Sequence, residues 1–136
     1  MKRVFVDSSG IFAHIVSEDA SHHPAEAAFT RARDEGWRLV TTNAVLYEVH
    51  ALILNRVRDG RRIALRFLDA VEAGFREVIR VTISDERRAM ELLRMRGDQN
   101  FSMCDALSFV VMGRLRIREA IAYDKHFTAY GRILVL

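Results

Sequence analysis

Four carboxylates have the types and spacing needed for metal chemistry: Asp7, Glu48, Asp105 and Asp124. Asp7 and Asp124 each close a short apolar run, so we expect them at the carboxyl ends of parallel strands, which share one edge of a sheet. Glu48 and Asp105 each lie about one turn into a segment of helical pattern, near the same edge. Two carboxylates about 4 Å apart repel by roughly 4 kcal/mol at an effective dielectric near 20. A group of four therefore requires a cation.

The surrounding residue types favour a hard divalent ion at these acids. Oxygen ligands without an accompanying set of Cys and His select Mg²⁺, with Mn²⁺ as a substitute, over Zn²⁺. None of the five histidines has the two-His spacing of a zinc protease. His126, two residues after Asp124, is interpreted as a solvated side chain like the others.

Each acid taken alone also has a purely structural interpretation. Glu48 borders the apolar stripe of its helix and would be satisfied there by an arginine or a helix terminus. Ser102 and Asp105 have the spacing of a capping box, in which both side chains bond to the backbone at the start of a helix. The metal site is favoured because all four acids fall on one side of one sheet.

The elements that must position these acids alternate along the chain. Solidly apolar runs, typical of strands buried on both faces, predict strands at 3–6, 38–41, 78–83, 120–123 and 133–136. Helical spacing predicts helices at 25–33, 44–57, 62–73, 85–95 and 102–114, with Ser84 and Ser102 as the caps of the last two. The alternation predicts an α/β protein, a three-layer α/β/α sandwich with a central, mostly parallel five-stranded sheet.

Composition sets limits on the class of protein. The 136 residues carry a formal charge of +3, and nothing marks a boundary, so we expect a single domain over 1–136. The one cysteine, Cys104, excludes an internal disulfide. The chain begins with Met1-Lys2-Arg3 and runs straight into a strand pattern, so we expect no signal peptide, no membrane span and a cytoplasmic location.

These motifs together resemble the PIN-domain nuclease family, and within it the VapC-type toxins of toxin–antitoxin pairs. The resemblance covers essentially the whole chain. Cys104 departs from it, because members commonly carry threonine just before the third acid, and a thiol is a poorer hydrogen-bonding group than a hydroxyl. The matching segments are VFVDSS at 4–9, VTTNAVLYE at 40–48, FSMCDALSF at 101–109 and AYDKHF at 122–127.

The resemblance implies a PIN-like fold and a magnesium-dependent endoribonuclease, the toxin of a toxin–antitoxin pair. Its site would be catalytic and metal-binding at once, with Asp7, Asp105 and Asp124 holding one or two ions and Glu48 ligating or orienting the attacking water. Ser9 and Asn43 would position substrate. The implied partners are RNA and a cognate antitoxin, and the implied products end in 5′-phosphate and 3′-hydroxyl. A homodimer is expected as well, from the apolar surface described below.

Other functions remain open from the residues alone. A phosphatase with an aspartyl nucleophile would need a second acid two residues after Asp7, where Ser9 stands. A receiver-like signalling module would lack Glu48 and Asp105. A catalytically inactive PIN-like module that binds RNA or protein would keep the fold and lose the chemistry.

Two surfaces are candidates for binding. An arginine cluster at a helix junction, Arg56, Arg58, Arg61 and Arg62, is the best candidate for contact with an RNA backbone. The helical pair over 44–73 has more apolar side chains than one sheet face requires, which predicts a surface for a partner. The alternative for this pair is burial beneath neighbouring helices.

Overall fold

The computed structural model describes residues 1–74 and 77–136. Its centre is one sheet of five parallel strands in the order β3-β2-β1-β4-β5. The strands are β1 (Arg3–Val6), β2 (Arg38–Thr42), β3 (Glu77–Ile79), β4 (Glu119–Ile121) and β5 (Leu134–Val135). The expected α/β sandwich is confirmed, with a sheet that is parallel throughout.

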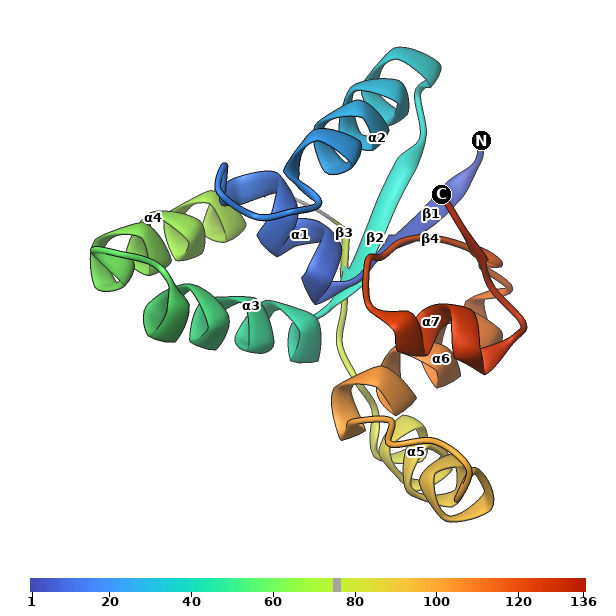
Figure 1. The fold of residues 1–136 in the computed structure, drawn as a ribbon. Coiled ribbons are helices and arrows are strands. Elements are labelled where there is room, and N and C mark those ends of the chain that lie inside the picture. The colour runs from blue at the N-terminus through green and yellow to red at the C-terminus, as the bar shows by residue number, and fades with distance from the viewer. Residues whose placement is uncertain (75–76) are drawn as a thin grey trace.

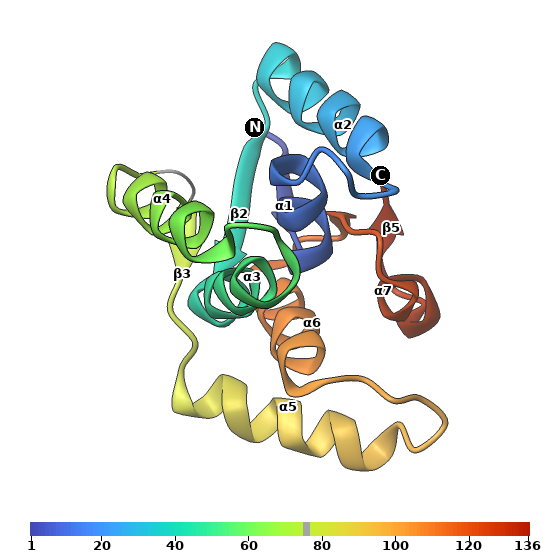
Figure 2. The same ribbon diagram turned by 60° about the vertical axis from the view of Figure 1, so that its left-hand side comes forward.

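Helices cover both sides of the sheet, with α1 to α4 gathered on one side and α5 to α7 on the other (Figures 1 and 2). The helices are α1 (Ser8–Ile15), α2 (His22–Glu35), α3 (Asn43–Arg56), α4 (Gly60–Glu72), α5 (Ile83–Met95), α6 (Met103–Leu115) and α7 (Lys125–Tyr130). No helix in the described residues is both long enough and apolar enough to cross a membrane.

The strand β3 and the start of α5 differ from the sequence prediction. The apolar run at 78–83 predicted one strand, but β3 ends at Ile79 and α5 begins at Ile83. Thr82, not Ser84, is the N-cap, because its hydroxyl accepts a hydrogen bond from Asp85 N while Asp85 accepts one from Thr82 N. This reciprocal capping box satisfies two backbone donors and overrides the apolar pattern.

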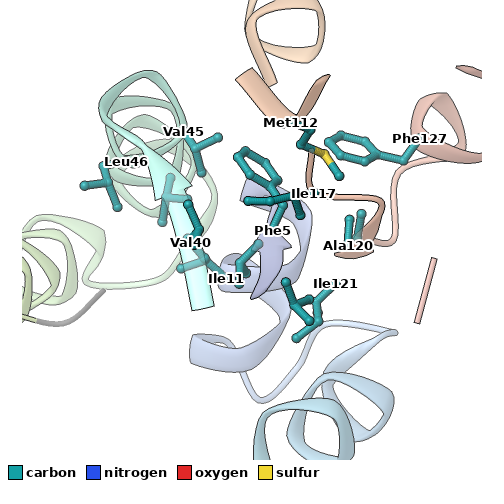
Figure 3. Close-up of a cluster of buried hydrophobic side chains, with 14 of the residues drawn as sticks. Phe5, Ile11, Val40, Val45, Leu46, Met112, Ile117, Ala120, Ile121 and Phe127 are labelled. Carbon is teal, nitrogen blue, oxygen red and sulfur yellow. The ribbon is translucent and has the colours of Figure 1, made fainter. Parts of the chain in front are cut away.

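The core lies between the sheet and the helices of both layers. Phe5 of β1 is fully buried, and its ring centroid lies 6.4 Å from that of Phe127 in α7. Figure 3 shows these rings with Met112, Val40 and Ile121 around them. Burial of each such side chain contributes about 1.5–3 kcal/mol, so the core fixes the strand ends that carry the acids.

Two glycines allow backbones to approach closely. A Cβ on Gly10 of α1 would lie 2.5 Å from the carbonyl oxygen of Ile121 in β4, and one on Gly60 would lie 2.5 Å from that of Ile53. Both separations are too short for a side chain. Gly10 therefore lets α1 pack directly on β4, and Gly60 joins α4 to α3.

The apolar helical pair α3 and α4 is partly buried and partly exposed. Leu46, Ile53 and Phe67 are buried in the core, as the alternative of burial requires. Leu54 and Leu65 remain 45% and 43% exposed. The pair thus covers the sheet and still leaves apolar side chains at the surface.

Candidate metal centre

The sheet topology brings Asp7 and Asp124 to one edge. Strands β1 and β4 pair in parallel, with Phe5 opposite Ala120 and Val6 opposite Ile121. The two strands are therefore neighbours in the sheet. The chain passes from β1 to β2 on one side of β1, whereas β4 lies on the other side of β1. Strand order therefore reverses between β1 and β4, and α/β proteins bind ligands at the carboxyl ends of the strands at such a point.

Asp7 is an almost completely buried carboxylate, 1% exposed, and the N-cap of α1. Its Oδ2 accepts hydrogen bonds from the Ser9 hydroxyl at 2.7 Å and the Ser9 amide at 3.2 Å. Burial raises the pKa of Asp7 to about 6; the Ser9 bonds act in the opposite direction, and the charge of Asp105 adds to the increase. Within the described residues Asp7 forms no ion pair with Lys or Arg.

Asp105 caps α6 and also lies beside the other groups of the centre. Its amide donates to the Ser102 hydroxyl at 3.0 Å, and its Oδ2 accepts from Ser102 N at 3.0 Å, so the predicted capping box is confirmed. The same Oδ2 lies 2.8 Å from Nδ1 of His126. Since Asp105 also affects the pKa of Asp7, capping of α6 and proximity to the other acids coexist in one side chain.

Asp124 and His126 complete this side of the centre. Asp124 is the N-cap of α7, and its Oδ1 accepts from the amide of His126 at 2.8 Å. The ring Nδ1 of His126 lies 3.4 Å from the same oxygen. Ligand atoms of Asp105, Asp124 and His126 all lie within 4.8 Å of one another, close enough to surround one ion.

The interpretation of His126 as a solvated side chain is wrong. Its side chain is 19% exposed and faces both Asp105 and Asp124. The sequence signal was its position two residues after Asp124. That signal was missed because the six-residue helix α7, which turns the ring back toward the acids, was not predicted.

Glu48 lies near Asp7 through a serine that the sequence reasoning also missed. The Ser8 hydroxyl donates to Glu48 Oε1 and lies 3.5 Å from Asp7 Oδ1. The thiol of Cys104 faces the same group: burial raises its pKa, and the charges of Glu48 and Asp7 raise it further. A protonated thiol therefore donates to Glu48, in the place of the expected hydroxyl.

The two expected positioning residues have different surroundings. The Ser9 hydroxyl donates to Asp7 and accepts from the amide of Tyr123 at 2.9 Å, so it links β1 to the segment after β4. The Asn43 side-chain oxygen accepts from the amide of Val81 at 2.9 Å. Asn43 therefore fixes the start of α3 to the connection between β3 and α5.

The donor set fits a divalent cation. Asp105, Asp124 and His126 form the group whose ligand atoms lie close enough for one ion, and Asp7 lies outside this group but near Asp105. Within residues 1–74 and 77–136 none of the three aspartates is paired with Lys or Arg. The raised pKa of Asp7 shows how costly its negative charge is without a cation. An ion held at these oxygens would remove that cost.

Comparisons with known proteins agree with this geometry. The model of the family described as "PIN domain" matches residues 4–133. The chain is 33% identical over 132 residues to the 23S rRNA-specific endonuclease VapC20 of Mycobacterium tuberculosis, with 97% of each chain covered. A crystal structure of that protein, described as a sarcin-ricin loop cleaving toxin, superposes with a TM-score of 0.87, 30% identity and coverage of 97% and 98%.

A more distant solved structure shares the fold alone. It is VapBC2 from Rickettsia felis bound to a DNA fragment from its promoter, with a TM-score of 0.69 at 12% identity, covering 98% of this chain and 97% of the other. The family match spans nearly the whole sheet and all four acids. The chain therefore belongs to the PIN domain family.

Proposed function

We propose that this chain is an endoribonuclease that depends on Mg²⁺, with Mn²⁺ as a substitute, and that it is the toxin of a toxin–antitoxin pair. One observation carries the proposal: the carboxylate of Asp7 is buried and has no Lys or Arg as an ion-pair partner in the described part of the chain. Asp7 lies beside Asp105, at the same edge of the sheet as Asp124. The similarity to an endonuclease specific for 23S rRNA supports RNA as the substrate.

In this proposal each acid has a defined task. Asp7, Asp105 and Asp124 would hold the ion, and His126 would orient Asp105 and Asp124 from the side. A divalent ion bound there lowers the pKa of water and stabilises negative charge on a phosphate. Glu48, held by the hydroxyl of Ser8, would orient the attacking water and accept its proton.

Ser9 and Asn43 would act on geometry. Ser9 bonds to both Asp7 and the backbone of Tyr123, so it would fix the distance between Asp7, after β1, and Asp124, after β4. Asn43 keeps the start of α3, and therefore Glu48 one turn later, fixed relative to the sheet. In-line attack by water would release RNA with a 5′-phosphate and leave a 3′-hydroxyl.

The test is cleavage of defined RNAs by the purified chain, with a fragment of 23S rRNA containing the sarcin–ricin loop as the first substrate. We expect cleavage in Mg²⁺, none in EDTA, and a loss of at least a hundredfold in Asp7→Asn. The ends of the products decide the mechanism. A 2′,3′-cyclic phosphate, or cleavage that survives in EDTA and in Asp7→Asn, would contradict the proposal.

The same proposal covers partners and location. We propose that residues 1–136 act as one domain in the cytoplasm, that the chain pairs with an antitoxin, and that two copies form a homodimer. The exposed Leu54 and Leu65 on α3 and α4 support a surface for one of these partners. Light scattering of the chain alone and with a co-expressed antitoxin would measure both states.

A further inference from the structure

A cavity of about 320 Å³ opens from the acidic centre, and the end of it away from the acids has no part in the mechanism above. It lies where α1 packs on α3, two neighbouring helices in Figure 2, and the segments after α1 and after β4 complete its wall. Its volume is in the range of pockets that hold small ligands. The lining includes Ser9, Phe12, Glu48, Arg56, Tyr123 and Asp124.

The charge along this cavity changes sign from one end to the other. Glu48, Leu52 and Arg56 of α3 all line it and are spaced four residues apart, so they lie on one face of the helix. At 1.5 Å per residue, Arg56 lies about 12 Å along the axis from Glu48. The acidic end belongs to the metal centre, and the basic end has no part in it.

Of the four arginines in the predicted cluster, Arg56 is the one that lines this cavity. Within the described residues Arg56 forms no ion pair, whereas Arg62 is paired with Asp59. Arg58 and Arg61 do not line the cavity. Among the described residues, Asp19 is the acid at the wall outside the metal centre, and its Oδ2 accepts a hydrogen bond from the amide of Ser21 at 2.9 Å. No ion pair within the described residues neutralises Arg56.

The walls near the metal centre are aromatic. The rings of Phe12 and Tyr123 both line the cavity, and the backbone of Tyr123 is held by Ser9 next to Asp7. The hydroxyl of Tyr123 is buried and has no hydrogen-bond partner in the part of the chain that the structure describes.

We infer that this cavity binds one nucleotide of single-stranded RNA beside the phosphate that is cleaved, with Arg56 on the flanking phosphate and the two rings against its base or ribose. The inference rests on the proposed ribonuclease function. Arginine binds phosphate through two parallel hydrogen bonds, and unstacked RNA bases pack on aromatic side chains. The cavity would thus offer a metal ion for the cleaved phosphate, aromatic rings for the base or ribose, and Arg56 for the next phosphate along the RNA chain.

The experiment measures binding of a 5′-fluorescein-labelled decauridylate by anisotropy in Ca²⁺, after a gel shows that the probe stays intact. We expect Arg56→Ala to raise Kd about tenfold. We also expect it to reduce the slope of log Kd against log salt by about 0.7, the value for one lost contact with a single-strand phosphate. Arg58→Ala is the matched control, because Arg58 is exposed, two residues away and outside the cavity. It should leave both quantities unchanged.

The aromatic wall has its own pair of variants. Tyr123→Phe keeps the ring and should bind the probe as well as the unaltered chain, whereas Tyr123→Leu should raise Kd several-fold in a chain that circular dichroism shows to be folded at the temperature of the assay. The inference is overturned if Arg56→Ala binds normally, or if Arg58→Ala weakens binding equally. Full affinity in Tyr123→Leu would overturn the role of the ring.

Cleavage kinetics separate this inference from the proposed function. If the unaltered chain cleaves RNA and Arg56→Ala has a normal KM, the nucleotide site is wrong and the ribonuclease stands. If the unaltered chain binds the probe through Arg56 but does not cleave RNA in Mg²⁺, the ribonuclease is wrong and the binding site stands. We expect a raised KM in Arg56→Ala with kcat changed less than about threefold.

Discussion

Asp7 and Asp85 are each 1% exposed, but within the described residues only Asp85 has a cation beside it. The guanidinium of Arg114 lies 2.8 Å from one oxygen of Asp85 and 3.0 Å from the other. Desolvation acts to raise the pKa of Asp85, but the hydrogen bonds from Arg114 and Thr82 outweigh it and hold the pKa below its ordinary value. Asp7 has only serine donors in the described residues, and its pKa is raised to about 6. Within the described residues the fold thus neutralises one of these acids with a cation and not the other.

Asp7→Asn should stabilise the metal-free chain in a pH-dependent way. The folded state raises the pKa of Asp7 from 3.8 to about 6, so its charge costs stability above pH 6 and costs nothing below about pH 4. At about 1.4 kcal/mol per pKa unit, the gain in unfolding free energy at pH 8 is up to about 3 kcal/mol. Urea unfolding in EDTA at pH 4 and pH 8 measures it. An equal change at both pH values would contradict this account of Asp7.

Removal of Arg114 should lower the free energy of unfolding, and it should do so at a place that has no part in the proposed reaction. Arg114→Met leaves the buried charge of Asp85 without its partner, and we expect a loss of about 2–3 kcal/mol at pH 7. Because the pKa of Asp85 is lowered below 3.8 in the folded state, the stabilisation is present above that pH and is lost as the pH falls through the folded pKa. Urea unfolding of Arg114→Met and the unaltered chain should therefore converge in acid. The RNA cleavage rate at 25 °C should change little.

Gly10→Ala should damage the site through the fold. The added Cβ would lie 2.5 Å from the carbonyl of Ile121, so α1 must move away from β4 and shift Asp7 relative to Asp124. We expect a loss of about 1–3 kcal/mol in stability together with weaker binding of Mn²⁺, measured by calorimetry. Gly60→Ala meets the backbone of α3 at the same distance and is the control. It should lose stability and keep more of the Mn²⁺ affinity than Gly10→Ala.

Cys104 should be unreactive although it lies at the centre. Burial and the neighbouring charges of Glu48 and Asp7 raise its pKa, so almost no thiolate is present at neutral pH. We expect alkylation by iodoacetamide at pH 8 to be at least a hundredfold slower in the native chain than in urea. Cys104→Ser, which keeps a donor to Glu48, should cleave RNA at a similar rate. Rapid native alkylation would show that the thiol does not face the acids as described.

Much of the fold could be predicted from the sequence because its signals are local. The strand β1 was predicted at its observed bounds, and the box of Ser102 and Asp105 was predicted from spacing alone. The start of α5 was wrong because Thr82 and Asp85 compete with an apolar run, and the short helix α7 has no periodic pattern long enough to detect. Local caps therefore decided the boundaries that hydrophobic pattern could not.

The site was only partly predictable for the same physical reason. The positions of Asp7 and Asp124 at one edge follow from parallel strands, but their adjacency depends on β4 pairing with β1. The contact between His126 and Asp105 depends on α7, and the bond from Ser8 to Glu48 depends on the packing of α1 on α3. Such contacts between distant segments arise from tertiary packing, which spacing along the chain does not encode.

A crystal structure of the chain soaked in Mn²⁺, with anomalous difference density, tests the central claim most directly. The account predicts a peak in contact with the carboxylates of Asp7, Asp105 and Asp124, and loss of that peak in Asp7→Asn. A chain that binds no Mn²⁺ at these acids, or binds it only elsewhere on its surface, would contradict the account.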